Sequence, residues 1–109
     1  MNGLHLLSYV FGGAFLANCL PHLAAGMMGR AFQSPFAKPP GEGLSSARTN
    51  VIWGFANLVA AYFLVCRVGA FDLRNGLHAL ALGVGIVLLA LFAAGHFGRF
   101  HGGNEPERP

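Results

Sequence analysis

Charged residues are scarce in this chain, and that scarcity limits what kind of protein it can be. Asp, Glu, Lys and Arg make up 10% of the 109 residues, whereas hydrophobic residues make up 54%. Soluble domains carry roughly 25% charge, because a water-facing surface needs polar groups. A soluble helical protein that is apolar on every face would aggregate. We therefore expect much of the surface to face lipid.

Acidic residues are the scarcest charges, and familiar catalytic motifs are missing. The four acids all lie outside the long apolar runs, at Glu42, Asp72, Glu105 and Glu107. Paired carboxylates for acid–base catalysis within a membrane are therefore disfavoured, and no GxSxG, HExxH or Walker sequence occurs. The basic residues are dispersed rather than clustered, which argues against nucleic-acid binding. No catalytic residue is assigned from the sequence.

The chain has two cysteines, and neither predicts a disulfide or a metal site. Cys19 lies deep in the first apolar run and Cys66 near the far end of the second, so their levels in a bilayer differ too much for an internal bridge. Cys19 and His22 share a helix face, but two ligands do not close a metal site. We expect no metal and no cofactor.

Three long apolar runs make up most of the chain, at residues 4–28, 49–66 and 75–98. At about 1.5 Å per residue, each reaches or nears the roughly 30 Å of a bilayer core. The first run has no basic segment before it and is too long for a signal peptide. The expected fold is all-α, an integral membrane bundle of three transmembrane helices. We expect one domain over 1–101 and a disordered cytoplasmic tail at 102–109.

Basic residues in the connecting segments predict the orientation, because short cytoplasmic loops are enriched in them. An N-terminus outside and a C-terminus in the cytoplasm place five basic residues in the cytoplasm and two outside. This orientation predicts a multi-pass protein of a cell membrane, of the bacterial cytoplasmic type. The five are Arg30, Lys38, Arg48, Arg99 and Arg108, and the two are Arg67 and Arg74.

Helix starts and helix contacts also leave local signals. Ser45 and Ser46 precede the second run and Asp72 precedes the third, and we expect both sites to cap their helices. Small residues recur at four-residue spacing in all three runs, as with Gly13 and Ala17. Such spacing permits close helix packing in lipid, either within one chain or between copies. Because three helices enclose little interior, we expect an oligomer.

Polar side chains within the runs should face protein or a cavity, because lipid cannot hydrogen-bond them. Asn50, Trp53 and Asn57 share one stripe of the second run, and Asn18 and His22 are four residues apart in the first. We expect Asn18 and Asn57 to be in contact. The simpler interpretation is that these amides only bind helices together; the alternative is that they line a cavity.

The connection at residues 29–47 is long for a helix hairpin. Its prolines stiffen the backbone and its glycines permit tight turns. It is either a connector held against the lipid headgroups or a structured cytoplasmic element that closes a polar cavity. On the second interpretation the cavity-lining candidates are Asn18, His22, Asn50, Asn57, Arg30, Lys38 and Glu42.

Two levels of paired histidines raise one cofactor alternative. His5 and His78 should lie near the outer surface, and His22 and His96 near the inner one. This pairing resembles the bis-histidine haem ligation of membrane b-type cytochromes in arrangement only. The 17 residues from His5 to His22 put those rings about 100° out of phase, so haem is disfavoured.

The sequence favours a non-enzymatic membrane protein, either an oligomeric channel or carrier or an accessory subunit of a membrane complex. One alternative is a membrane enzyme acting on a lipid or other apolar substrate at the cytoplasmic face, using His22, Arg30, Lys38 and Glu42. The second is a haem-binding electron carrier. The expected partners are the lipid bilayer and either further copies of this chain or other membrane subunits, and not nucleic acid.

Overall fold

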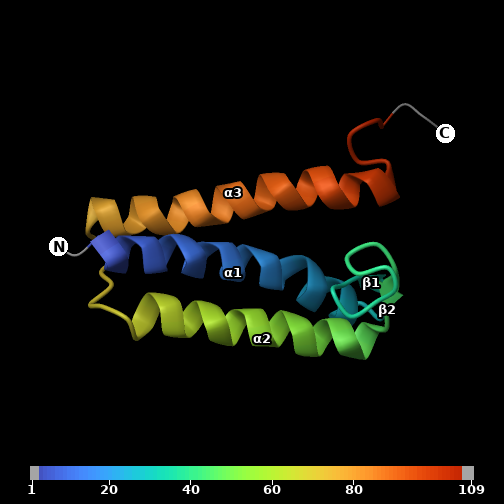
Figure 1. The fold of residues 1–109 in the computed structure, drawn as a ribbon, viewed down its shortest axis with the longest axis horizontal. Helices are drawn as coiled ribbons and strands as arrows, with labels where there is room; N and C mark the ends of the chain where they lie inside the picture. The colour runs from blue at the N-terminus through green and yellow to red at the C-terminus, as the bar shows by residue number, and fades with distance from the viewer. Residues whose placement is uncertain (1–2, 107–109) are drawn as a thin grey trace.

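The computed structural model describes residues 3–106 as three helices with a small β-hairpin between the first two (Figure 1). The helices are α1 (Gly3–Met27), α2 (Ala47–Cys66) and α3 (Gly76–His101). Each is long and apolar enough to cross a membrane, as the three apolar runs predicted. α1 lies between the other two; α3 runs in the same direction as α1, and α2 runs in the opposite direction.

The helix starts follow the capping rules, with one change from the sequence prediction. The Ser46 side chain accepts a hydrogen bond from the Thr49 N–H at 3.2 Å, so the predicted cap of α2 is confirmed. The predicted cap of α3 at Asp72 is wrong, because the Asn75 side chain takes that role and accepts from the Leu77 N–H at 2.9 Å. Asp72 instead shapes the preceding turn, where its carbonyl oxygen accepts from the Asn75 N–H.

Small residues let α1 approach both neighbours closely. A Cβ added at Gly54 of α2 would meet the Leu23 backbone of α1 at 2.8 Å, and one added at Gly85 of α3 would meet the Val10 carbonyl of α1. α2 and α3 hardly touch each other. These small residues therefore serve packing within one chain, whereas a Cβ at Gly83 would meet nothing within 4 Å.

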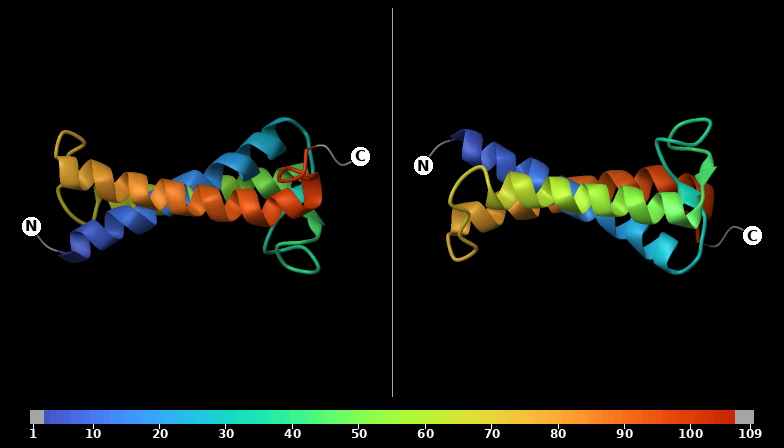
Figure 2. Two further views of the ribbon diagram at one scale, coloured as in Figure 1. Left: turned by 90° about the horizontal axis from the view of Figure 1, so that it is seen from above. Right: turned by 90° about the horizontal axis from the view of Figure 1, so that it is seen from below.

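The connection between α1 and α2 is folded rather than extended. It contains β1 (Phe32–Gln33) and β2 (Leu44–Ser45), which pair antiparallel with Phe32 opposite Ser45. This hairpin lies at the end of the bundle where α3 finishes (Figure 2). Within the predicted disordered tail, residues 102–106 turn back on α3, where the Asn104 amide donates to the Ala94 carbonyl oxygen at 3.2 Å. Residues 107–109 of that tail lie outside the described residues.

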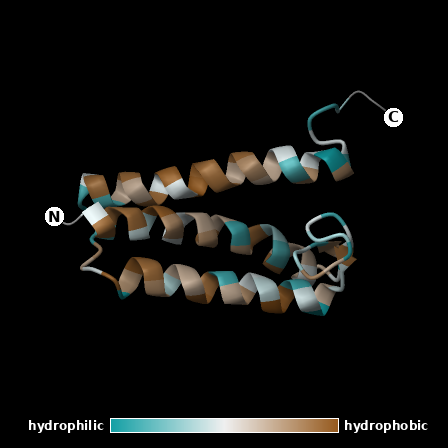
Figure 3. Ribbon diagram, viewed as in Figure 1, coloured by the Kyte–Doolittle hydropathy of each residue, from teal (hydrophilic) through white to brown (hydrophobic). Residues whose placement is uncertain are grey.

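The interior is more polar than the exterior. The largest fully buried side chains are those of Tyr9, Asn50, Asn57 and Ser34, whereas many large apolar side chains are exposed. The middle of α3 forms a continuous apolar stretch, and hydrophilic segments gather toward the hairpin end (Figure 3). This distribution suits a protein whose outer surface meets lipid and whose polar groups bond one another inside.

Candidate functional site

Asn50 ties the hairpin to the helices. It lies in the first turn of α2 and is 0% exposed. Its Nδ2 group faces three backbone carbonyl oxygens, those of Phe32 and Ser45 at 3.2 Å each and of Ser46 at 3.0 Å. Since carbonyl oxygens only accept hydrogen bonds, this environment determines which end of the amide is nitrogen. The Asn50 oxygen must therefore face the opposite side, toward α1.

His22 lies against the Asn50 oxygen, and this contact determines which ring nitrogen of His22 carries the hydrogen. Its Nδ1 lies 2.8 Å from Asn50 Oδ1, and because the oxygen is an acceptor, Nδ1 carries the hydrogen and donates it. In the neutral ring Nε2 then holds a lone pair. No group in the described part of the chain hydrogen-bonds this Nε2. The ring is 2% exposed and packs edge-on against Phe32, Trp53 and Phe97.

A second amide pair joins α1 and α2 one level deeper in the bundle. Asn18 Nδ2 donates to Asn57 Oδ1 at 3.0 Å, so the predicted contact is confirmed. Asn57 Nδ2 donates in turn to the Trp53 carbonyl oxygen at 2.7 Å. These bonds pair both ends of the Asn57 amide, which is 2% exposed, inside the bundle.

The indole N–H of Trp53, unlike these amides, has no hydrogen-bond partner in the described part of the chain. Among residues 3–106, its Nε1 is the one side-chain nitrogen or oxygen atom that has no exposed surface of its own and no hydrogen-bond partner. The ring packs edge-on against Phe36, with ring centroids 5.1 Å apart. An unpaired buried N–H costs about 1–3 kcal/mol, so an acceptor arriving beside it would bind favourably.

A pocket of about 340 Å³ opens beside these groups at the hairpin end. A second pocket of about 360 Å³ shares Asn18, Trp53 and Phe92 with the first and continues along α1 to Phe11. All three helices contribute to the second pocket. We call the two together the lateral groove. It is lined by Phe11, Ala14, Phe15, Asn18, His22, Ser34, Pro35, Pro40, Gly41, Trp53, Asn57, Leu89, Phe92, His96 and Phe97.

We call the connection between α1 and α2, residues 28–46, the hairpin segment. It closes the polar end of the lateral groove and is hydrogen-bonded to α3. His96 Nε2 lies 2.7 Å from the Gly41 carbonyl oxygen and must donate to it. His96 Nδ1 accepts from Arg99 Nη2 at 2.9 Å, so both ring nitrogens are engaged. Within the segment, the Gly41 N–H donates to the Ser34 carbonyl oxygen at 2.8 Å. The segment therefore forms a fixed wall of the groove.

Comparison with known proteins does not extend this description. No family model, curated protein or solved structure matches the chain. What the lateral groove does must follow from its own residues.

The structure brings some of the predicted site residues together and leaves others apart. Asn18, His22 and Asn57 line the lateral groove, and Asn50 lies behind His22 and orients it. The three charged candidates are exposed, and none is among the lining residues; these are Arg30, Lys38 and Glu42. In the same connection, Ser34 is buried and the ring of Phe32 packs against His22.

Most of the lining residues were not selected from the sequence as cavity residues, and Trp53 and His96 are two with polar ring atoms. Trp53 lies on the predicted polar stripe of α2. Its place in the sequence between two amides of that stripe was the pattern that could have indicated a cavity residue. His96 is 55 residues from its partner Gly41, and only the folded hairpin brings them together. No local pattern in the sequence carries such a long-range contact.

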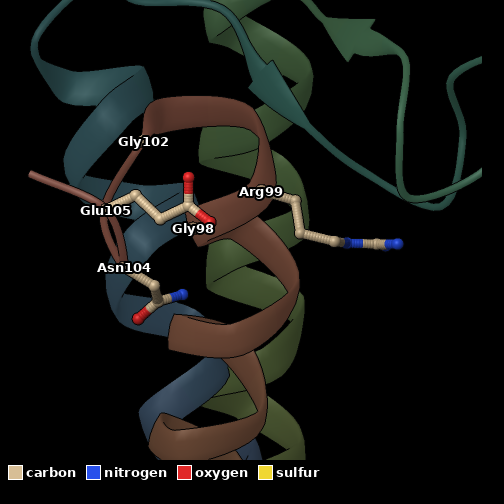
Figure 4. A pocket seen from close by; sticks show the side chains of 5 residues that line it. All are labelled: Gly98, Arg99, Gly102, Asn104 and Glu105. Carbon is tan, nitrogen blue, oxygen red and sulfur yellow. The ribbon is translucent and has the colours of Figure 1, made fainter. Parts of the chain in front are cut away.

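A separate pocket of about 310 Å³ lies at the end of α3, under the turn formed by residues 102–106 (Figure 4). Its polar side chains do not converge, since Arg99 extends away from Glu105 and Asn104. Arg99 is bonded to His96, and Asn104 holds the turn against the Ala94 carbonyl oxygen. This pocket is a consequence of the turn and offers no focused binding chemistry.

Proposed function

We propose that the protein is a non-enzymatic membrane carrier or accessory subunit that holds one small lipophilic molecule in the lateral groove. The observation that carries this proposal is the buried, unpaired Nε1–H of Trp53, a residue that lines the groove. Unpaired polar groups are rare in protein interiors and rarer where no water can reach them. A bound molecule with an acceptor group would remove the penalty.

The shape of the groove supports an elongated apolar guest. Each of its two pockets falls within the roughly 300–1,000 Å³ range of small-molecule sites. From His22 to Phe11 the groove follows α1 for 11 residues, or about 16 Å at the helical rise. Its polar groups lie at the hairpin end, and rings and aliphatic side chains line the rest. An amphiphilic molecule has the same polarity pattern along its length.

The route of entry also favours a molecule dissolved in the bilayer. α2 and α3 hardly touch, so the groove between them is bounded by α1 on one side and opens toward the surrounding lipid on the other. The hairpin segment closes the end that faces water. A guest would therefore enter sideways from the membrane rather than along a channel axis.

The enzyme alternative is less well supported by this arrangement. Chemistry on a lipid headgroup needs charged or nucleophilic side chains that converge on the guest. Arg30, Lys38 and Glu42 are exposed instead, and none of them lines the groove. The haem alternative is also less well supported. Among the described residues, His22 keeps a free Nε2, but His96, expected at the same level, uses both of its ring nitrogens in bonds to Gly41 and Arg99.

The proposal includes the orientation and assembly expected from the sequence. With the N-terminus outside, the hairpin segment and its positive charges meet the cytoplasmic leaflet of a cell membrane. Self-association, or pairing with another membrane subunit, would use the exposed face of α3, where Gly83 is not needed for packing within the chain. Both points stay predictions, and their tests are given in the Discussion.

The sole tryptophan provides the test of binding. Protein in phospholipid vesicles is titrated with β-bromododecanol, whose bromine quenches indole fluorescence on contact, at known mole fractions in the bilayer. Because Trp53 lines the groove, we expect saturable quenching at mole fractions well below those needed for quenching by brominated phospholipid.

Two leucine variants control for occupancy of the groove. Ala14→Leu fills the groove beside α1 and should abolish saturation, whereas Ala90→Leu, on the exposed face of α3, should leave it unchanged. Quenching that rises linearly with mole fraction in all three proteins would mean that Trp53 meets only bulk lipid. That result would overturn the proposed function.

A further inference from the structure

We infer that the polar end of the lateral groove selects a guest whose head is a neutral hydroxyl, which donates a hydrogen bond to His22 and accepts one from Trp53. The inference rests on the proposed function and specifies the chemical class of the guest. Long-chain alcohols and un-ionised long-chain carboxylic acids share this head chemistry. Ethers, esters and hydrocarbons lack the donor, and ionised heads carry a charge that the groove does not pair.

The acceptor half of the recognition comes from His22. Three backbone carbonyl oxygens orient the Asn50 amide, the amide oxygen holds the hydrogen on His22 Nδ1, and Nε2 is left with its lone pair. No described group uses this lone pair. Since His22 lines the groove, the lone pair is available to a guest's O–H group.

The donor half comes from Trp53. Its Nε1–H is buried and unpaired, and the residue lines the same pocket as His22. The two ring centroids are 6.4 Å apart. The two rings are therefore neighbours, and a single hydroxyl oxygen bonds two nitrogens when each lies about 2.9 Å from it. A hydroxyl is the smallest group with both functions.

The remaining lining residues disfavour a charged head. Both nitrogens of His96 are bonded, to Gly41 and to Arg99. Ser34 Oγ is hydrogen-bonded to Ser45 Oγ at 2.5 Å. No Lys, Arg, Asp or Glu lines either pocket of the groove. A carboxylate or phosphate placed here would lose its hydration without gaining a counter-charge.

The test compares three head groups on the same brominated dodecyl tail: β-bromododecanol, its methyl ether and the corresponding carboxylic acid. The binding of each is measured by saturable quenching of Trp53 fluorescence. We expect the alcohol to bind about tenfold more tightly than the ether, the equivalent of one hydrogen bond. The acid should bind like the alcohol while protonated and weaken by at least tenfold when ionised. This last comparison separates an alcohol-specific site from one that accepts any neutral hydroxyl.

Two variants of His22 separate its role in the fold from its role toward the guest. In His22→Asn, the side-chain nitrogen takes the place of Nδ1 and keeps the bond to Asn50, but nothing replaces the lone pair at Nε2. In His22→Gln, the amide reaches the position of Nε2 and restores an acceptor. The alcohol's advantage over the ether should vanish in His22→Asn and return in part in His22→Gln.

A second readout covers the donor. With one tryptophan, the protein has a single indole N–H signal in its nitrogen–proton NMR spectrum, and the alcohol should shift this signal downfield to saturation. Saturable binding with equal affinity for alcohol and ether, or an unshifted indole signal, would overturn the inference while the proposed function stands. Equal affinities and an unshifted indole signal are the results expected if a water molecule already bridges His22 and Trp53. Absence of saturable binding by every probe would overturn both.

Discussion

Asn50 shows how one buried amide controls its surroundings in this chain. Its four polar contacts reach α1, the hairpin and its own helix start, and they determine the tautomer of His22. The sequence predicted a shared stripe for Asn50 and Asn57 from helical spacing, because spacing alone places side chains on a face. It did not predict the different partners of the two amides. Asn50 depends on Phe32 and Ser45, whose positions come from the folded hairpin.

The two amides should therefore respond differently to the same substitution. Asn50→Leu leaves the His22 N–H without its acceptor and the Phe32 and Ser45 carbonyl groups without their donor, so we expect a loss of at least about 2 kcal/mol of unfolding free energy. Asn57→Leu removes mainly the bond to Asn18 and should cost about 1 kcal/mol. Unfolding in mixed micelles monitored by circular dichroism measures both. Equal losses would contradict the central position of Asn50.

At the scale of elements, the hairpin segment is the part that sequence reasoning left open. Proline and glycine content indicated turns at 29–47, and the structure shows a segment that is hydrogen-bonded to α2 and α3 and packs a ring against α1. Capping chemistry located the start of α2 at Ser45 and Ser46, of which Ser46 is the cap, but placed the cap of α3 three residues early, at Asp72 instead of Asn75. Both Asp and Asn cap helices well, so residue type alone does not decide between Asp72 and Asn75.

Matched glycine substitutions test the rigidity of the hairpin segment. A Cβ at Gly43 would collide with the Lys38 carbonyl group, so Gly43→Ala should displace the segment at a cost of about 1–3 kcal/mol. Gly76→Ala, at the start of α3, meets nothing within 4 Å and should be neutral or stabilising by up to about 1 kcal/mol.

Hydrogen exchange of the Gly41 amide reports this displacement directly. That N–H donates to the Ser34 carbonyl oxygen and should be protected in the wild type and in Gly76→Ala. It should exchange faster in Gly43→Ala, because the bond lies within the displaced segment. Fast exchange in the wild type would mean that the segment is a loose connector rather than a wall of the groove.

For the whole molecule, the number and type of helices followed from apolar runs, because lipid imposes a minimum length and forbids unpaired backbone groups. The groove could not be predicted from the sequence, because it depends on α2 and α3 packing against α1 without packing against each other. That arrangement results from where small residues such as Gly54 and Gly85 face α1. Residue spacing alone does not say which helix a given face will meet.

Cysteine labelling tests the orientation of the whole molecule. Cys66 is exposed at the end of α2, and Cys19 is buried and so protected from reagents. A membrane-impermeant maleimide added to intact cells should label Cys66. In a Cys66→Ala background, a cysteine introduced by Glu42→Cys in the hairpin segment should react only after the cytoplasmic side is opened. Labelling of position 42 from outside would reverse the orientation.

Assembly is tested by mass. In lipid nanodiscs or a mild detergent we expect a species of two or more chains, because the apolar face of α3 is largely unused within one chain. Gly83→Leu, which adds bulk to that face without an internal clash, should shift the population toward single chains. A uniform monomer in several lipids would remove self-association from the account.

If the lateral groove holds a lipophilic molecule, that molecule should remain in the protein when it is isolated from its native membrane. The chain is purified from its own membranes beside Ala14→Leu and Ala90→Leu, extracted with organic solvent, and the extracts are quantified by mass spectrometry. We expect one hydroxyl-bearing lipophile, near one per chain, in the wild type and in Ala90→Leu, and strongly reduced in Ala14→Leu. Extracts that match bulk membrane lipid in all three proteins would contradict the proposal that the groove holds such a molecule.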